Sequence, residues 1–499
     1  MAVGRGLGHA ALTATQRTES KAAIGVDFGT LASTGALETA WPAASNRGAI
    51  AWVGGVRYSS NGTSWSSLSQ GAAGILQMSD GSGAFGQTNI KYDSGGLQVL
   101  NSDGSLGVNI MPGGIAKRNT FVGVDSGTVA GSGVENTAVG RLTLANLSTG
   151  GTNTAVGYCS LLGTTTGSNN SSVGHLALRM NSSGASNCAF GTQALFNNTT
   201  GGNNVAIGHG ALTQNTAGTL NIAIGTNSSS KTTTGSFSTM VGADTFLDNT
   251  VGSASSGFGY QALSRNTSGS GNSAFGSQAL IFTTTGSLNS AFGEKAGDGN
   301  TAGSRNSYVG EQAGYLQQTG NDNAALGAYA FNGGASPFQA SSVTAIGAYA
   351  LTGVTGAASN NTAVGYKAGA AVTTGASNIL IGFQAADNVT TGSGNIVIGI
   401  DIDSIAPGQN NSLNIGNIIF GSSVDGVAAI ISSGNIGIGA SDPTERLDVN
   451  GSAIRVRTSR TPASATASGV AGTVCWDSNY IYVCTATNVW KRVAVLTWV

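Results

Sequence analysis

Two glutamate residues could do hydrolytic chemistry if the fold brings them together. Glu294 and Glu311 each directly follow a glycine, and both glycines belong to one regularly spaced series. Two carboxyl groups about 5 Å apart are the arrangement with which a retaining glycosidase cleaves a sugar chain. Whether these side chains meet depends on whether the structure repeats at the spacing of the glycines.

The glycine series runs through the middle of the chain. From Gly123 to Gly327 it has a constant seventeen-residue step; the step loosens at Gly347 and Gly365 and later returns to its first value. Such a period predicts a solenoid whose coils stack about 4.8 Å apart. Nineteen such anchor glycines, the last being Gly439, imply a rod of roughly 90 Å.

Residues around the anchor glycine predict how each coil is built. Position −1 is apolar in every coil and position −2 is mostly alanine, so both faces of a strand here avoid charge, which is typical of a strand covered on both sides. The Ala-Leu pair at positions +3 and +4, as in Ala177-Leu178, predicts a second short strand, and Asn-Thr-Thr-Gly segments predict the return turn. Asparagine at position −4 predicts a hydrogen-bonded ladder along the rod.

A coil with two short strands and apolar residues on both strand faces has one face left over. The same face of another copy is its natural partner. The sequence therefore predicts a symmetric homo-oligomer around a central axis.

The predicted coils place Glu294 and Glu311 about 5 Å apart. The same +1 position holds Arg141, Tyr158 or Ser277 in other coils, which is typical of a variable position that faces solvent, and no aromatic cleft is evident around the pair. We therefore predict that the chain is not an enzyme, and a capsule-degrading spike is a lesser alternative.

Neither a metal site nor a cofactor is predicted. His175 and His209 both occupy position +1, two coils and thus about 10 Å apart, too far to share a metal ion. No phosphate-binding loop, zinc pattern or nucleophile elbow occurs. Four cysteines are too few for a disulfide framework. We expect reduced thiols, although Cys475 and Cys484 flank one predicted hairpin and could pair across it.

Composition limits the partners. Gly makes up 79 of 499 residues, charged residues 9% and the formal net charge is −1, so no overall field draws the chain to nucleic acid or to an acidic membrane surface. The N-terminal stretch has no apolar core like that of a secretory signal, and no apolar run long enough to span a membrane follows. We expect synthesis in a cytoplasm, without membrane insertion.

The two ends of the chain resemble each other and differ from the repeats. All six tryptophans lie outside the repeats, and the order Trp, Tyr, Trp recurs at similar spacing in Trp52, Tyr58 and Trp65 and in Trp476, Tyr482 and Trp490. Alternating apolar residues and the turn Asn61-Gly62 predict a small β-hairpin module at each end.

Repeat units such as Asn-Thr-Ala-Val-Gly (136–140) and Asn-Val-Ala-Ile-Gly (204–208) resemble the head repeats of trimeric autotransporter adhesins. Similar repeats occur in bacteriophage tail fibres, where they often precede a segment like 435–451. The resemblance implies an all-β fold, a trimeric left-handed parallel β-roll. The stretch 452–499 is too short for the C-terminal chaperone that many fibres carry.

These observations together predict a virion tail fibre that contacts a receptor on the host surface. A bacterial trimeric adhesin is the alternative, but that class uses a signal peptide and a C-terminal membrane barrel, which we do not recognise here. The expected partners are two further copies of the chain, a virion tail or baseplate protein, and a host glycan or protein. We expect a virion location after synthesis in the host cytoplasm.

The predicted organisation is a virion-docking segment (1–46), a small β module (47–115), a β-roll shaft (116–440), a connector (441–460) and a C-terminal hairpin tip (461–499). Aromatic and cationic side chains suit recognition, and the repeated surface of the shaft does not. The predicted receptor-binding residues are therefore in the tip: Trp476, Tyr480, Tyr482, Trp490, Lys491 and Arg492. The alternative is that these aromatic side chains fill the core of a trimer and the cations stay solvated.

Overall fold

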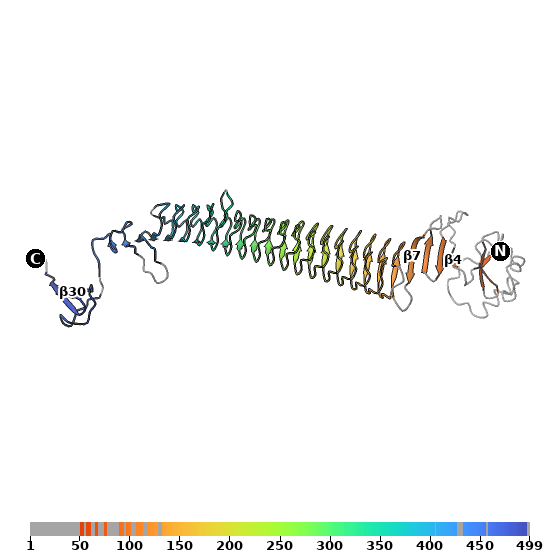
Figure 1. The fold of residues 1–499 in the computed structure, drawn as a ribbon, viewed down its shortest axis with the longest axis horizontal. Coiled ribbons are helices and arrows are strands. Elements are labelled where there is room, and N and C mark those ends of the chain that lie inside the picture. Colours follow the sequence, from red (N-terminus) through yellow and green to blue (C-terminus); the bar gives the residue numbers. More distant parts are fainter. Residues whose placement is uncertain are drawn as a thin grey trace, which may run out of the picture.

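A computed structural model describes the backbone of seven strands between residues 50 and 112, and residues 118–127, 132–334, 336–404, 406–426, 433–455 and 458–496. The predicted docking segment 1–46 lies outside the described residues. The described part is all-β and forms a long rod (Figure 1). This confirms the predicted fold class, a parallel β-solenoid whose coils follow the seventeen-residue period; its handedness and its assembly as a trimer stay predictions.

Most strands are three residues long, one in each coil. Each pairs in parallel with the strand of the next coil, from β8 to β25, so that the ladder follows chain order along the rod. These strands are β8 (Thr120–Val122), β9 (Thr137–Val139), β10 (Thr154–Val156), β11 (Ser171–Val173), β12 (Cys188–Phe190), β13 (Val205–Ile207), β14 (Ile222–Ile224), β15 (Thr239–Val241), β16 (Ser256–Phe258), β17 (Ser273–Phe275), β18 (Ser290–Phe292), β19 (Ser307–Val309), β20 (Ala324–Leu326), β21 (Thr344–Ile346), β22 (Thr362–Val364), β23 (Ile379–Ile381), β24 (Ile396–Ile398) and β25 (Leu413–Ile415).

Antiparallel strands extend this ladder at its N-terminal end, and both kinds of pair extend it at its C-terminal end. Before β8 come β4 (Gly74–Leu76), β5 (Asn89–Asp93), β6 (Gly96–Leu100) and β7 (Leu106–Pro112). After β25 come β26 (Ile419–Gly421), β27 (Ile436–Ile438) and β28 (Leu447–Val449). Strands β4 and β28 therefore end the ladder at opposite ends of the rod (Figure 1).

Each end of the chain also carries a separate three-stranded antiparallel sheet. One consists of β1 (Ile50–Val53), β2 (Val56–Ser60) and β3 (Trp65–Ser67), the other of β29 (Val474–Trp476), β30 (Tyr480–Ala486) and β31 (Val489–Ala494). The registers match, because Ala51 pairs with Tyr58 as Cys475 pairs with Tyr482. The similarity between the two ends that the tryptophan spacing predicts is thus present in the strand pairing.

The second strand predicted in each coil is not formed. Leu176 and Leu178, at positions +2 and +4, have φ of 61° and 50°. These left-handed backbone conformations do not occur in a β-strand. Leu176 N donates to Tyr158 O of the preceding coil, whereas Leu178 N donates to Ala194 O of the following coil, each at 2.9 Å. Bonds in both directions along the rod stabilise a backbone conformation that costs a leucine about 1–2 kcal/mol.

The interior of the rod is a narrow apolar core. Positions −2, +3 and +4 fill it, and Ala189, Ala194 and Leu195 of one coil are all fully buried. In the coil with the large Tyr308 at position −2, position +4 is a glycine: the ring of the buried Tyr308 lies only 2.4 Å from a Cβ added at Gly314. In the coil where Met240 and Phe246 are both large and buried, position −2 of the next coil is Gly257, whose added Cβ would lie 2.8 Å from the Met240 sulfur. Small residues in the same or the next coil thus make room for large core side chains.

Buried asparagines form the predicted ladder. Asn170 N and Nδ2 both donate to Asn153 Oδ1 at 3.0 Å, and Asn170 Nδ2 also donates to Gly184 O at 3.0 Å. Asn187 N then donates to Asn170 Oδ1 at 3.0 Å, which repeats the pattern one coil on. Each asparagine thus satisfies backbone groups of neighbouring coils and fixes the register of the stack.

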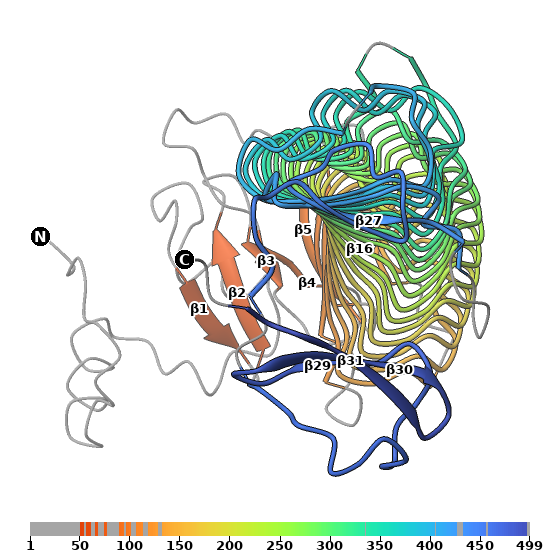
Figure 2. The ribbon, with the colours of Figure 1, turned by 90° about the vertical axis from the view of Figure 1, so that its left-hand side faces the viewer.

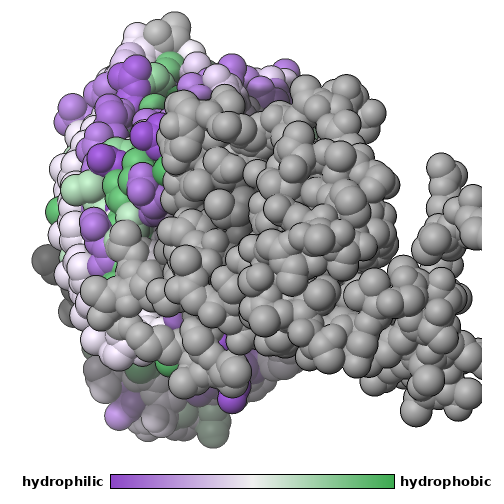
Figure 3. Space-filling model, turned by 90° about the vertical axis from the view of Figure 1, so that its right-hand side faces the viewer, coloured by the Kyte–Doolittle hydropathy of each residue, from purple (hydrophilic) through white to green (hydrophobic). Residues whose placement is uncertain are grey.

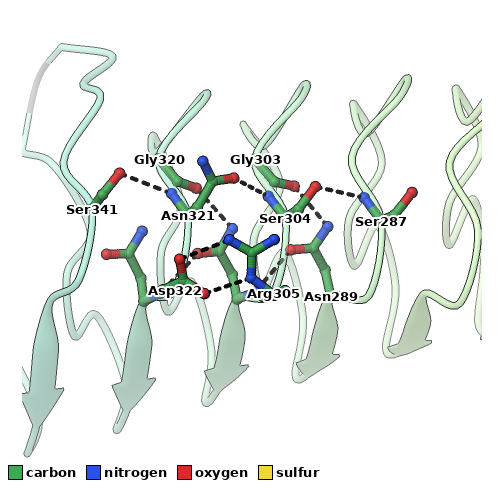
Figure 4. Close-up of polar contacts among 11 residues, drawn as sticks. Ser287, Asn289, Gly303, Ser304, Arg305, Gly320, Asn321, Asp322 and Ser341 are labelled. Atoms are coloured by element: carbon green, nitrogen blue, oxygen red, sulfur yellow. Dashed lines mark hydrogen bonds and ion pairs between the residues drawn. The ribbon is translucent and has the colours of Figure 1, made fainter.

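A second polar ladder runs along the turns (Figure 4). Ser287 N donates to Ser304 Oγ at 3.1 Å, and Ser304 N donates to Asn321 Oδ1 at 2.7 Å. Surface charges also pair at one-coil spacing, since Arg305 Nε and Nη2 bind the two carboxylate oxygens of Asp322 at 2.7 and 2.9 Å. Viewed along the rod, successive coils lie over one another with a gradual rotation (Figure 2).

The outer face of the strand ladder is apolar and partly exposed among the described residues. Position −1 side chains point away from the core and form a continuous row, which we call the apolar stripe. Phe258, Phe275 and Phe292 stack in it with ring centroids 4.8 Å apart. Figure 3, which looks along the rod from its N-terminal end, shows hydrophobic residues beside hydrophilic ones on the described surface. Exposed members of the stripe are Val139, Phe190, Ile207, Phe292, Val309, Leu326, Ile346, Ile381 and Ile438.

Candidate functional site

The coil geometry brings the two candidate glutamates together. Strands β18 and β19 are neighbours in the ladder, and Gln312 N donates to Glu294 O at 2.9 Å, so Glu294 and Glu311 follow matching positions of adjacent coils. Both side chains are exposed. The structure therefore agrees with the predicted adjacency of this acid pair on the surface of the rod.

One member of the pair is held by a neighbouring tyrosine. Tyr329 Oη donates to Glu311 Oε1 at 2.8 Å, and this hydrogen bond raises the pKa of Tyr329 above its ordinary value. A donor fixed on a strongly bonded coil limits the positions that the Glu311 carboxylate can adopt. Glu311 is thus the better oriented of the two glutamates.

Tyr329 also begins a row of aromatic rings on consecutive coils. The ring centroids of Tyr329 and Tyr349 are 5.2 Å apart with planes 3° from parallel; those of Tyr349 and Tyr366 are 6.1 Å apart at 78°; those of Tyr366 and Phe383 are 5.4 Å apart at 20°. Tyr349, Tyr366 and Phe383 are 38–47% exposed. We call these four residues the aromatic row, and it leads along the rod from the acid pair.

The sequence shows no aromatic cleft around the glutamates, and it did not lead us to predict this row of exposed rings beside Glu311. Tyr329 and Tyr349 occupy position +2, whereas Tyr366 and Phe383 occupy position +1. Tyr349, Tyr366 and Phe383 follow one another at seventeen-residue steps, but Tyr329 precedes Tyr349 by twenty residues. Counting each coil from its own anchor glycine therefore puts the four rings in two neighbouring columns, and the ring contacts show that these columns form one row.

Within the described residues, no group of three or more His, Cys, Asp or Glu side chains could hold a metal ion. His175 stacks on Tyr158 with ring centroids 5.5 Å apart, and His209 lies two coils away from it. All four cysteines are free, including Cys475 and Cys484. The described part also has no helix long and apolar enough to cross a membrane.

Two of the six residues predicted to bind a receptor lie inside the C-terminal module. Tyr482 and Trp490 pack with Cys475 and Cys484 in its small core. Tyr482 Oη donates to Asp477 Oδ2 at 2.7 Å, and Trp490 Nε1 donates to the carbonyl of Ala467 at 3.0 Å. These hydrogen bonds satisfy the polar ends of both rings, so both residues stabilise the module by packing.

The other four lie nearer the surface of the same module. Trp476 and Tyr480 are half-buried, and Lys491 and Arg492 are exposed. The Arg492 guanidinium lies 4.1 Å from the Tyr480 ring centroid, which orders this cation by a cation–π contact. Receptor contact through these residues stays a prediction.

A buried carboxyl group, that of Asp298, makes stability depend on pH. Asp298 lies in the coil of Glu294 and is 8% exposed; burial raises its pKa to about 6, opposed by the nearby Lys295. Because the unfolded chain releases this proton near 3.8, unfolding is favoured as pH rises from about 4 to about 6. Partial screening leaves a loss on the order of 1–2 kcal/mol.

We expect the variant Asp298→Asn to melt at a higher temperature than the unsubstituted protein at pH 7 and at a similar temperature at pH 4. Thermal unfolding of both proteins followed by circular dichroism measures this difference. Equal melting temperatures at pH 7 would contradict the burial of a charged Asp298.

Two curated proteins share a short similarity with this chain. "Depolymerase, capsule K30/K69-specific" of Klebsiella phage K64-1 is 42% identical over 57 residues, and "Depolymerase 1, capsule K30/K69-specific" of Klebsiella phage K5-2 is 46% identical over 56 residues. Each alignment covers 11% of this chain and spans only 7% of the length of the relative. No family model and no solved structure matches the chain.

These similarities correct the prediction that the chain is not an enzyme, because both relatives are named as enzymes that act on capsules. Variation at a repeated position does not by itself exclude a catalytic site, because coil-by-coil variation on a repeating scaffold can also build a local site. The similarities support the predicted origin in a bacteriophage tail. They favour a capsule-degrading spike at least as much as a fibre that only binds.

Proposed function

We propose that this protein is a bacteriophage tail protein that degrades the capsular polysaccharide of the host during adsorption. The observation that carries the proposal is the similarity to two phage capsule depolymerases. A solenoid rod is a suitable support, because its rigid coils hold surface residues at fixed spacing along an extended polymer.

The acid pair is the candidate catalytic centre. Carboxylates on adjacent coils, about 4.8 Å apart at the backbone, fit the separation of about 5–5.5 Å in retaining glycosidases. Glu311, oriented by Tyr329, would attack the anomeric carbon. Glu294 would protonate the departing glycosidic oxygen and later take a proton from the water that releases the glycosyl ester.

The test is degradation of purified Klebsiella K30 and K69 capsular polysaccharides, measured as loss of viscosity and release of reducing ends. We expect cleavage of at least one, and a loss of activity of at least about 1,000-fold in both Glu294→Gln and Glu311→Gln. Glu135→Gln is the control, since that exposed glutamate pairs with Arg118 elsewhere on the rod. If both variants of the pair keep full activity, these two residues are not catalytic. If the protein cleaves neither capsule, the two polysaccharides are not its substrates.

A second candidate function is receptor binding by the C-terminal module, as a tail fibre would perform it. The exposed cations Lys491 and Arg492, one of them ordered over Tyr480, favour it. The functional form that we propose for both candidates is a homotrimer joined through the apolar stripe, with the N-terminal segment docked on the virion.

A further inference from the structure

Binding of a long polymer at the acid pair requires contacts beyond the pair itself, and the aromatic row lies where such contacts would be made. Its rings occupy four consecutive coils, and Tyr329 is directly hydrogen-bonded to Glu311. The row and the pair therefore form one continuous surface along the rod. No other stretch of the described +1 and +2 positions carries aromatic residues on four consecutive coils.

The chemistry of this surface suits a sugar chain. Two pairs of rings stack and Tyr349 meets Tyr366 edge to face, and Tyr349, Tyr366 and Phe383 are exposed to solvent. Sugar units likewise combine apolar C–H surface with hydroxyl groups, and tyrosine can contact both kinds of group with little loss of side-chain entropy. The coil spacing of about 4.8 Å is close to the length of one pyranose unit in an extended polysaccharide.

A cation on the row indicates the charge of the polymer. Lys367 Nζ lies 5.4 Å from the Tyr366 ring centroid. Lys367 forms no salt bridge with another described residue and its ammonium group contacts only the face of Tyr366, so this group is available for an anionic ligand. A uronate or another acidic sugar placed on Tyr366 would put its carboxylate within reach of this ammonium group.

We propose that the aromatic row, with Lys367, is a binding track for an extended acidic polysaccharide that runs parallel to the rod with about one sugar per coil and ends at the acid pair. The part of this proposal in which the track leads to a catalytic Glu311 rests on the proposed depolymerase function. Its ability to bind the polymer does not depend on cleavage.

Binding is best measured without hydrolysis, in the full-length Glu294→Gln protein, where the hydrogen bond between Tyr329 and Glu311 is kept. The probes are alginate and polygalacturonate, with neutral dextran for comparison, each cast into native gels for affinity electrophoresis. We expect at least one acidic polymer, but not dextran, to retard the protein.

Adding Tyr349→Ala and Tyr366→Ala together should weaken this retardation at least about tenfold. Tyr158→Ala is the matched control, because Tyr158 is an equally exposed tyrosine at position +1 that stacks on His175 far from the row. Lys367→Gln, which leaves every ring in place, should weaken binding about fivefold at low salt and reduce its salt dependence.

Retardation by neither acidic polymer, or an equal effect of the row variants and Tyr158→Ala, would overturn the track. If binding depends on the row but the unsubstituted protein cleaves no capsule, the proposed binding track stands and the proposed depolymerase function is rejected. Cleavage that is unchanged by the row variants would keep the depolymerase and reject the track.

Discussion

Replacing Gly208 by alanine should lower the free energy of unfolding by more than about 3 kcal/mol. Gly208 is an anchor glycine with φ of 133°, and a Cβ at this position would lie 2.5 Å from the carbonyl oxygen of Gly225 in the next coil. That oxygen belongs to a backbone held by inter-coil hydrogen bonds, so it cannot move without separating the coils. The substitution thus combines a strained φ with a steric conflict.

Gly416→Ala is the matched control. Gly416 belongs to the same series of anchor glycines, but its φ is 60° and no heavy atom lies within 4 Å of an added Cβ. Here only the left-handed conformation is penalised, by about 1 kcal/mol. Thermal and denaturant unfolding of both variants measures the difference, and equal losses would mean that close stacking does not explain the glycine period.

The second large effect concerns assembly. Phe275 is stacked between Phe258 and Phe292 on the apolar stripe, so Phe275→Asp should convert the proposed trimer into single chains that keep their fold. A carboxylate within a dry interface between copies is strongly unfavourable, whereas on an isolated rod the same side chain would point into water. Multi-angle light scattering should give about three times 49.2 kDa before the substitution and about one chain mass after it.

Phe282→Asp serves as the control for Phe275→Asp. Phe282 is also exposed, but it lies on the turn side of its coil with the Arg265 guanidinium 4.7 Å from its ring centroid, so its replacement should leave the trimer intact. A mass of one chain for the unsubstituted protein would reject the trimer. Dissociation by both substitutions would place the interface elsewhere.

Much of the fold could be predicted because it repeats. A glycine that must accept close contact with the next coil recurs at every coil, so its period reveals the coil length directly. The buried asparagine ladder was predictable for the same reason, since each side chain bonds its counterpart in the next coil. The turn side was mispredicted, because the Ala-Leu pattern is compatible with a strand and only the backbone angles of Leu178 and its equivalents exclude one.

Less of the candidate site could be predicted. The adjacency of Glu294 and Glu311 follows from the period, but the rings beside them occupy two different positions relative to the anchor glycine, and Tyr329 and Tyr349 are separated by a coil of twenty residues. Composition indicated aromatic and cationic residues in the C-terminal module as a surface. Lys491 and Arg492 are exposed, as expected, but packing places Tyr482 and Trp490 in the core of the module.

The sequence by itself determined the repeating architecture, since steric and hydrogen-bonding requirements that return at every coil leave a periodic trace in residue type. Only the tertiary structure decided which side chains of different coils share a surface. Glu311 and Tyr329 lie one regular coil apart but at different positions in their coils, whereas Tyr329 and Tyr349 are separated by a coil of twenty residues. Inserted residues change the sequence spacing but not the stacking of strands at about 4.8 Å, so the period alone does not reveal contacts between different positions of neighbouring coils.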